Sequence, residues 1–379
     1  MAQDQRIWRG SAGLPPDGSR PPHGTRPAPS AALRRGRRVV SPPCRAMPLL
    51  IDDIDADHSV SMTWEVDANG TLRHNPSGMQ VSPDRGVEVD GQAYRLSPHD
   101  IELDSDTLLG SGASGVVQAG YHKPTGVRVA VKTVKVDNKE KREQMLNDIK
   151  GLIQAAGCPY LVQWYAGFVS KETGLVHVVV ELMDCGSLAD LRRRLGGAGV
   201  PHEHLACIAA QIVRGLHHLQ TRRLLHRDVK PENVLHNLAG EVKLTDFGIS
   251  KDLTSEVGVA ATFVGTANYM SPERALGKDY SYRSDVWSAG MVVYELATGQ
   301  YPFSTKVFLE LYECLCMKPE PRLDVEAFPA VLCDFVAQCL TRDETRRPDA
   351  STLVSHELVD GQGEAGVSAL AKWLASQPI

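Results

Sequence analysis

One stretch of the chain combines side chains whose types and spacing could transfer a phosphoryl group. It reads His-Arg-Asp-Val-Lys-Pro-Glu-Asn at 226–233 and ends in Asp-Phe-Gly at 246–248. Phosphoryl transfer passes through a loose transition state, so it needs a carboxylate to orient the attacking hydroxyl and oxygen ligands for Mg²⁺. Asp228 is therefore the candidate base, and Asn233 and Asp246 are the candidate metal ligands. Either end of the stretch alone could occur by chance in a loop, but both in this order favour the chemical interpretation.

Two elements are expected to position this stretch. Apolar residues recur at helical spacing over 204–222, which predicts an amphipathic helix that leads directly into the candidate catalytic residues. Val242–Leu244 has the character of a short strand that delivers Asp246 to the same place. The candidate base and one candidate metal ligand are thus expected to stand on separate elements.

A glycine-rich turn precedes these elements. Gly110, Gly112 and Gly115 lie between two strand-like runs, and glycines allow a backbone turn to approach phosphates closely. The same spacing occurs in dinucleotide-binding folds, where a helix follows the turn. Here a second strand, 127–134, follows instead and carries Lys132. The arrangement favours a nucleotide-binding site that is covered by two strands and the glycine-rich turn between them.

Together, the stretch at 226–248, the glycine turn and the Val-Ala-Val-Lys run at 129–132 resemble the protein kinases. The resemblance implies an α+β, two-lobed protein kinase fold, with a small antiparallel-sheet N-lobe and a mainly helical C-lobe. It also implies ATP and Mg²⁺, with Lys132 on the α- and β-phosphates and Lys230 on the γ-phosphate. The implied ATP-site residues are Leu109, Gly110, Gly112, Ser114, Gly115, Val117, Ala130, Lys132, Asp148, Val180, Glu181 and Met183; the catalytic residues are Asp228 and Lys230; the metal ligands are Asn233 and Asp246.

Kinases pair the strand lysine with a glutamate on the helix that follows. That helix is expected at about 139–155, with Met145 and Leu152 on its apolar stripe. Asp148 lies on this buried side, whereas Glu143 is about 140° away around the helix. We therefore assign the pairing role to Asp148, one methylene shorter than the usual glutamate; the alternative is a local cap or salt bridge.

The segment between the lobes follows a continuous β-branched run at 176–180, which predicts a buried strand. The resemblance implies that the backbone C=O of Glu181 and the N–H of Met183 meet the adenine edge. Val180 would be a small gatekeeper at the rear of the pocket. In the large lobe, the resemblance implies an ion pair between Glu273 and Arg347, and it makes Asp285 the anchor of the catalytic loop.

The segment 262–274, Thr-Phe-Val-Gly-Thr-Ala-Asn-Tyr-Met-Ser-Pro-Glu-Arg, resembles the MAP kinase kinase family in particular. The resemblance covers roughly 98–358 and implies a dual-specificity kinase that phosphorylates Thr and Tyr of a MAP kinase activation loop. It implies activation by an upstream MAP kinase kinase kinase through phosphorylation in this segment. Thr262 matches the second phosphorylation site and is expected to pair with Arg227. Gly258 occupies the first, so Ser255 is the candidate there.

Two other functional classes remain open. One is a Ser/Thr kinase of the MAP kinase kinase kinase or sterile-20-like type, which shares most of the generic motifs. The other is a pseudokinase that acts as a scaffold. Lys132, Asp228, Asn233 and Asp246 are all present, so only the unusual Asp148 leans towards the scaffold.

Composition is ordinary for a folded protein of 379 residues, with 42% hydrophobic and 23% charged residues, but the charge is unevenly distributed. Residues 1–50 hold nine Arg, no Lys and two Asp, and the remainder is strongly acidic. An acidic body argues against nucleic-acid binding. Eight Cys without a paired framework favour reduced thiols, and no apolar run is long enough for a membrane span. The expected compartment is the cytoplasm, with the nucleus as a second one.

These observations predict five regions. They are a disordered, basic, Pro- and Arg-rich tail at 1–57, an N-terminal extension with hairpins around Asn69-Gly70 and Asp90-Gly91 at 58–100, the kinase N-lobe at 101–183, the C-lobe at 184–360 and a C-terminal tail at 361–379. For the basic tail, four interpretations stay open: an undedicated tail, an organelle transit peptide, a start at Met47, or a docking peptide at Arg34–Val40.

Overall fold

The computed structural model divides into two units, Met1–Arg45 and Ala46–Ile379. The structure describes residues 64–66, 72–74, 79–82, 86–89, 92–94, 98–112, 115–135, 145, 149, 151–169, 175–246, 268–303 and 307–377. All of them lie in the second unit, and up to residue 98 only the backbone is described.

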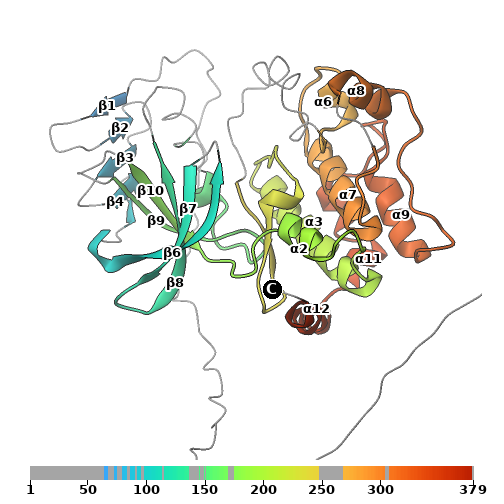
Figure 1. Cartoon of the computed structure of the whole chain (residues 1–379). Helices are drawn as coiled ribbons and strands as arrows, with labels where there is room; N and C mark the ends of the chain where they lie inside the picture. Colours follow the sequence, from blue (N-terminus) through green and yellow to red (C-terminus); the bar gives the residue numbers. More distant parts are fainter. Residues whose placement is uncertain are drawn as a thin grey trace, which may run out of the picture. The chain divides into compact units, whose positions relative to one another are not determined.

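The small lobe is built on a five-stranded antiparallel sheet with the order β6-β7-β8-β10-β9 (Figure 1). Its strands are β6 (Ile101–Gly112), β7 (Gly115–His122), β8 (Val127–Val134), β9 (Trp164–Val169) and β10 (Val176–Glu181). Side chains alternate along a strand, so Val129 and Val131 pack into one apolar cluster with Phe168. The same alternation turns Ala130 and Lys132 to the opposite face of the sheet.

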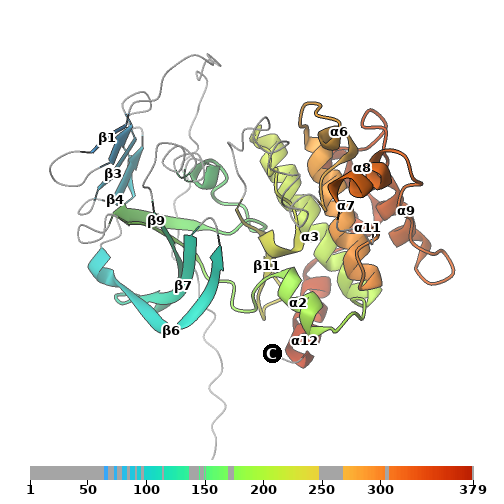
Figure 2. The same cartoon turned by 45° about the horizontal axis from the view of Figure 1, so that its top comes forward.

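The N-terminal extension forms a separate five-stranded antiparallel sheet, with the strands in sequence order. It consists of β1 (Trp64–Val66), β2 (Leu72–His74), β3 (Met79–Ser82), β4 (Gly86–Val89) and β5 (Gln92–Tyr94). The two hairpins predicted around Asn69-Gly70 and Asp90-Gly91 are confirmed, because β1 pairs with β2 and β4 with β5. The backbone of β3, β4 and β5 lies beside β9, at the edge of the kinase sheet (Figure 2).

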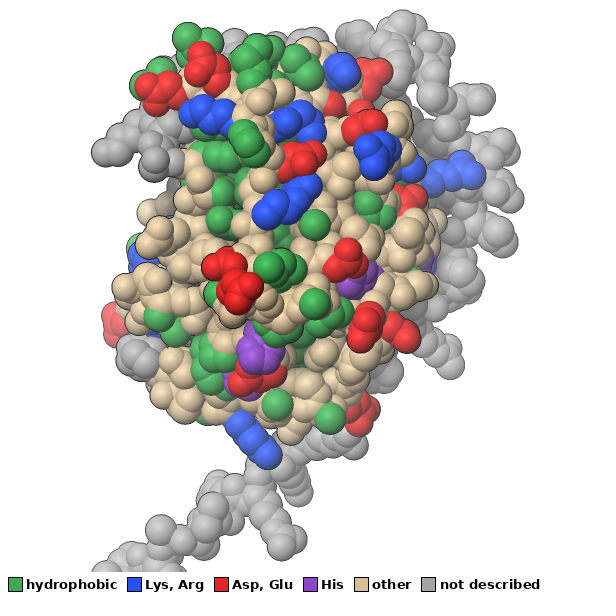
Figure 3. All heavy atoms as spheres, turned by 90° about the vertical axis from the view of Figure 1, so that its right-hand side faces the viewer, with side chains coloured by type: hydrophobic (Ala, Val, Ile, Leu, Met, Phe, Trp, Pro, Cys, Tyr) green, Lys and Arg blue, Asp and Glu red, His purple; other side chains and the backbone are tan. Residues whose placement is uncertain are grey.

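The large lobe is mainly helical, as expected. Its helices are α2 (Leu188–Arg194), α3 (His202–Thr221), α6 (Pro272–Ala275), α7 (Tyr282–Thr298), α8 (Phe308–Cys316), α9 (Ala330–Cys339), α10 (Ala350–Leu353), α11 (Glu357–Asp360) and α12 (Glu364–Ser376). A 3₁₀ turn, Pro231–Asn233, leads into a hairpin of β11 (Val234–His236) and β12 (Val242–Leu244). Helices α3 and α7 pack against each other at the centre of one large apolar core, in which Trp287 is fully buried. On the outer face of this lobe, acidic and basic side chains are interspersed (Figure 3).

The C-terminal segment, which the sequence marked only as a tail, forms helix α12 on the surface of α3. Leu370 and Leu374 are buried, and the ring of Trp373 stacks on His204 with 5.1 Å between centroids. The helix therefore adds apolar surface to the core of the large lobe.

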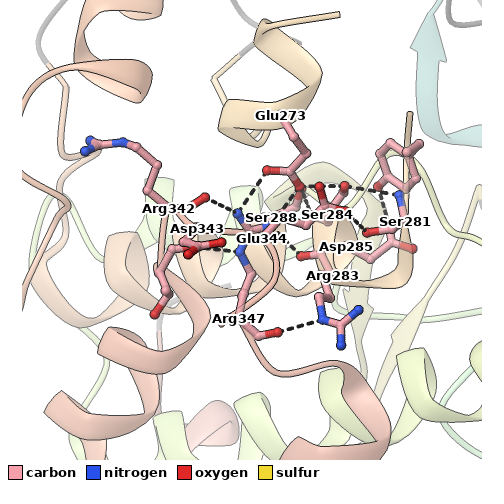
Figure 4. A network of polar contacts seen from close by, with 12 residues as sticks. Glu273, Ser281, Arg283, Ser284, Asp285, Ser288, Arg342, Asp343, Glu344 and Arg347 are labelled. Atoms are coloured by element: carbon pink, nitrogen blue, oxygen red, sulfur yellow. Dashed lines mark hydrogen bonds and ion pairs between the residues drawn. The ribbon is translucent and has the colours of Figure 1, made fainter. Parts of the chain in front are cut away.

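A polar network inside the large lobe joins three distant parts of the chain (Figure 4). The expected pair of Glu273 and Arg347 is bidentate, at 2.7 and 2.9 Å, and the two residues are only 3% and 1% exposed. Ser284 donates a third hydrogen bond to the Glu273 carboxylate, and Arg347 lies over the ring of Trp287. Burial alone would raise the pKa of Glu273, but the hydrogen bonds and charge of Arg347 outweigh it and lower that pKa.

Replacing Glu273 should destabilise the large lobe strongly. In Glu273→Gln, the Arg347 guanidinium stays buried without a counter-charge, and removing one partner of such a pair costs about 3–5 kcal/mol. Because the pKa of Glu273 is lowered by folding, its stabilisation is present above the usual carboxyl pKa and is lost as pH falls through the lowered value. Urea unfolding as a function of pH measures both effects.

Glu320→Gln is the matched control. Glu320 pairs with Arg322 at 2.7 Å in a far more exposed setting, where such pairs contribute less than about 1 kcal/mol. Equal stability losses in the two variants would contradict the assigned role of the buried pair.

Candidate active site

Most of the predicted ATP-site residues, together with Asp246, line one cleft of about 390 Å³, a volume typical of small-molecule sites. Those described along it are Leu109, Gly110, Gly115, Val117, Ala130, Lys132, Val180, Glu181, Met183 and Asp246. They come from the inner face of the small-lobe sheet, from the segment after β10 and from the end of β12. Residues separated by more than a hundred positions are therefore brought together as the sequence predicted.

The glycine turn connects β6 and β7 at the mouth of the cleft. Gly110 pairs with Val117 and Gly112 with Gly115, so the strands remain in contact up to the turn. Gly115 has φ +121°, and a Cβ there would lie 2.3 Å from the backbone oxygen of Thr133. Strands β7 and β8 approach each other so closely at this point that only glycine fits. Ser114, also predicted here, lies outside the described residues.

Lys132 projects from β8 across the cleft. Its Nζ donates to Oδ1 of Asp246 at 2.8 Å, which links the small-lobe sheet to the end of β12. Asp148, the predicted helical partner of Lys132, lies outside the described residues, and that pairing stays a prediction. The described helix residues Met145 and Ile149 are buried against the sheet, as the apolar stripe requires.

The candidate base is held by its two neighbours in the catalytic loop. Oδ2 of Asp228 accepts hydrogen bonds from Nζ of Lys230 and from Nδ2 of Asn233, both at 2.8 Å. Nδ2 of Asn233 also donates to the backbone oxygen of Asp228 at 2.8 Å. With its nitrogen engaged in this way, Asn233 has its amide oxygen left to face a metal.

Asp285, at the start of α7, anchors the backbone of this loop. Its carboxylate accepts hydrogen bonds from the backbone N–H of His226 at 2.8 Å and of Arg227 at 2.9 Å. Arg227 is left-handed, with φ +68°, a conformation that costs free energy for any residue with a Cβ. Burial lowers the pKa of His226, so its ring is neutral at neutral pH.

The two candidate metal ligands meet at one end of the β11–β12 hairpin. The backbone N–H of Thr245 donates to the backbone oxygen of Asn233 at 3.0 Å, which places Asp246 next to the 3₁₀ turn. An amide oxygen and a carboxylate form a donor set suited to a hard cation such as Mg²⁺. Within the described ranges no three His, Cys, Asp or Glu gather as a metal cluster.

The hinge, residues 181–183 between the two lobes, makes a contact that the sequence did not suggest. Oε1 of Glu181 accepts a hydrogen bond from Nζ of Lys243 at 2.6 Å, and Lys243 is only 5% exposed. The other carboxylate oxygen accepts from the backbone N–H of Gln163 at 3.2 Å. The side chain of Glu181 thus ties the hinge to β12, whereas the sequence indicated a role only for its backbone.

Further polar residues line the cleft where the sequence predicted none. They are Lys135, Ser187, Asp190, Glu232 and Thr245. Ser187 and Asp190 form a capping box at the start of α2, in which the backbone N–H and the side chain of Ser187 both bond Asp190. The Ser-x-x-Asp spacing is a readable helix-start signal, and it could have placed both residues at this edge of the cleft.

Comparison with known proteins agrees with this geometry. The model of the protein kinase domain family matches residues 103–359. The chain is 36% identical to mitogen-activated protein kinase kinase 1 of Arabidopsis thaliana over 86% of its own length and 93% of the relative. It is 38% identical to mitogen-activated protein kinase kinase 2 of the same plant, over 79% and 84%. A dual specificity mitogen-activated protein kinase kinase 1 of Dictyostelium discoideum is 38% identical over 53% of this chain and 30% of the relative.

The chain is therefore a protein kinase, an enzyme that uses ATP. Within that class it belongs to the MAP kinase kinase family. In the described part of the chain, no helix is both long and apolar enough to cross a bilayer.

Two variants of this site should distinguish ATP binding from phosphoryl transfer. Asp228→Asn removes the candidate base but no cleft-lining side chain, so we expect kcat to fall about 10²- to 10⁴-fold at unchanged ATP affinity. Lys132→Met removes a cleft-lining cation and should weaken ATP binding itself. Steady-state kinetics and calorimetric titration with a non-hydrolysable ATP analogue measure the two quantities. A large loss of ATP affinity in Asp228→Asn would contradict this division of roles.

Proposed function

We propose that this protein is a dual-specificity kinase that transfers the γ-phosphoryl group of ATP to Thr and Tyr of a MAP kinase activation loop. The observation that carries the proposal is the pair of Lys132 and Asp246 in the cleft, with Asp228 and Asn233 bonded to each other in the catalytic loop, next to Asp246. This set contains every side chain that the transfer requires, which favours an active enzyme over a pseudokinase scaffold. The substrate class rests on the names of the relatives, which are MAP kinase kinases.

In the proposed reaction, ATP lies with its adenine against the backbone of 181–183 and its phosphates under the glycine turn. Lys132 binds the α- and β-phosphates. Asn233 and Asp246 would hold Mg²⁺, which neutralises phosphate charge when bound. Asp228 orients the substrate hydroxyl and accepts its proton as the oxygen bonds to the γ-phosphorus and the bond to the β-phosphate oxygen breaks. Lys230, whose Nζ lies 2.8 Å from Oδ2 of Asp228, stabilises the negative charge on the transferring γ-phosphoryl group.

We further propose that an upstream MAP kinase kinase kinase activates the enzyme by phosphorylating Thr262, with Ser255 as the candidate first site. Both residues lie outside the described ranges. The proposal is supported by two guanidinium groups at the catalytic loop, since Nη1 of Arg274 donates to the backbone oxygen of Arg227 at 3.3 Å. A phosphate that pairs with Arg227 would favour one arrangement of the loop that contains Asp228.

We place the protein in the cytoplasm, with the nucleus as a second compartment. Seven cysteines among the described residues are free thiols, and this supports a reducing environment.

Phosphorylation of a purified Thr-x-Tyr MAP kinase tests the substrate assignment. We expect the protein, incubated with Mg²⁺ and ATP, to place phosphate on both the Thr and the Tyr of that motif, and mass spectrometry of the loop peptide detects each. Asp228→Asn is the control for contaminating kinases. Phosphate on Ser or Thr of another kinase, and never on Tyr, would identify a MAP kinase kinase kinase or sterile-20-like enzyme instead.

Thr262→Ala tests the proposed activation. After incubation with an active upstream kinase, wild type should gain activity towards the MAP kinase, whereas Thr262→Ala should stay at its basal rate because no phosphate can pair with Arg227. Ser255→Ala is the matched variant in the same segment and should lose only part of the activation. If Thr262→Ala is activated as fully as wild type, the role of Thr262 is wrong.

A further inference from the structure

The β11–β12 hairpin carries both candidate metal ligands but is too small to hold its own geometry. Its strands have three residues each and form a sheet of only two strands. A two-stranded hairpin is marginally stable by itself in water. Asn233 directly precedes β11, and Asp246 follows β12 by two residues. Their separation therefore depends on whatever holds this hairpin in register.

Gln211, in the middle of α3, bonds directly to the backbone of the hairpin. Its Oε1 accepts a hydrogen bond from the backbone N–H of Val242 at 2.9 Å, and its Nε2 donates to the backbone oxygen of Gly240 at 3.0 Å. The side chain is 4% exposed, on a helix otherwise packed into the apolar core. A buried amide that satisfies two backbone groups of a neighbouring element fixes the position of that element.

The next turn of α3 fixes β12 at a second point. A Cβ at Gly215 would lie 3.0 Å from Cδ1 of Leu244 and 3.1 Å from the backbone oxygen of Tyr160. On its other side, Leu244 exchanges backbone hydrogen bonds with Tyr160 and Val162, both at 3.0 Å. Strand β12 is thus enclosed between α3 and the segment before β9, and Gln211 is the polar contact that sets its position along α3.

We propose that Gln211 is a positioning residue for the metal site, and this rests on the proposed function of Asn233 and Asp246. Gln211 touches neither ATP nor metal. It holds the hairpin so that the amide oxygen of Asn233 and the carboxylate of Asp246 face the same phosphates. Residues that orient metal ligands in this way change metal affinity about 10- to 100-fold when they are replaced.

Gln211→Met removes both hydrogen bonds at nearly constant side-chain length, and Gln220→Met is its control. Gln220 stands on the same helix, and its Nε2 donates to Asp349 at 2.9 Å while its Oε1 accepts from the backbone of Ser351. It therefore anchors α10 and leaves the hairpin untouched. Gln211→Glu is a second variant, in which the carboxylate still accepts from Val242 but turns an oxygen in place of a donor towards the Gly240 oxygen.

The experiment measures Mn²⁺ affinity by water-proton relaxation, with full-length protein saturated by a non-hydrolysable ATP analogue. We expect both Gln211→Met and Gln211→Glu to weaken Mn²⁺ binding about tenfold or more, and Gln220→Met to leave it unchanged. Deuterium exchange without nucleotide gives a second measurement: amides of 234–246 should exchange faster in Gln211→Met only. Melting temperatures should fall in both Met variants.

Wild-type Mn²⁺ affinity in Gln211→Met, or an equal loss in Gln220→Met, would overturn the proposal. Asp246→Asn separates its failure from that of the proposed function. If Asp246→Asn also binds Mn²⁺ like wild type, the metal site itself is wrongly assigned and both proposals fail. If only Asp246→Asn weakens binding, the metal site stands and the role of Gln211 falls.

Discussion

The catalytic loop depends on one carboxylate, that of Asp285. It accepts two successive backbone N–H groups, those of His226 and Arg227, and so holds a turn in which Arg227 is left-handed. Asp285 can do this because α7 is itself immobilised in the core around the fully buried Trp287. Asp228 directly follows the strained turn, so its side chain is oriented before substrate binds. Through Asp285, the apolar core of the large lobe thus contributes to catalysis.

The parts of the site that could be predicted are those in which chemistry and local structure share one short segment. The glycine turn, the alternation that points Lys132 into the cleft, and the order of Asp228, Asn233 and Asp246 all follow from spacings of a few residues. Period-2 alternation and helical periodicity act over the same short range, so strands β8 and β10 and helix α3 were also predictable. In these segments local preference and final structure agree.

Contacts made across the fold were not predictable in the same way. Glu181 and Lys243 are 62 residues apart, and Gln211 and Val242 are 31 apart. In sequence, Lys243 is a cation in a short strand and Gln211 a polar residue in an apolar helix. Only the packing of α3 against β12 gives Gln211 its partner, and only the approach of the end of β10 to β12 gives Lys243 its partner. In the extension sheet, two hairpins were predictable because the sequence contains Asn-Gly and Asp-Gly there. The individual strands were not, because strands of three or four residues carry little periodic signal.

The left-handed residues limit how far this enzyme can be stabilised without loss of activity. Arg227 and Asp246, at φ +68° and +54°, each hold a conformation that costs about 1–2 kcal/mol for a residue with a Cβ. Glycine would relieve this strain but would delete a functional side chain, so thermostability and turnover are in direct conflict at both positions. Arg223, at φ +57°, has no such conflict. It is exposed and follows the C-cap of α3, where glycine is favoured. Among the residues that the structure describes, selection for thermostability can thus change one strained position freely and two only at the expense of activity.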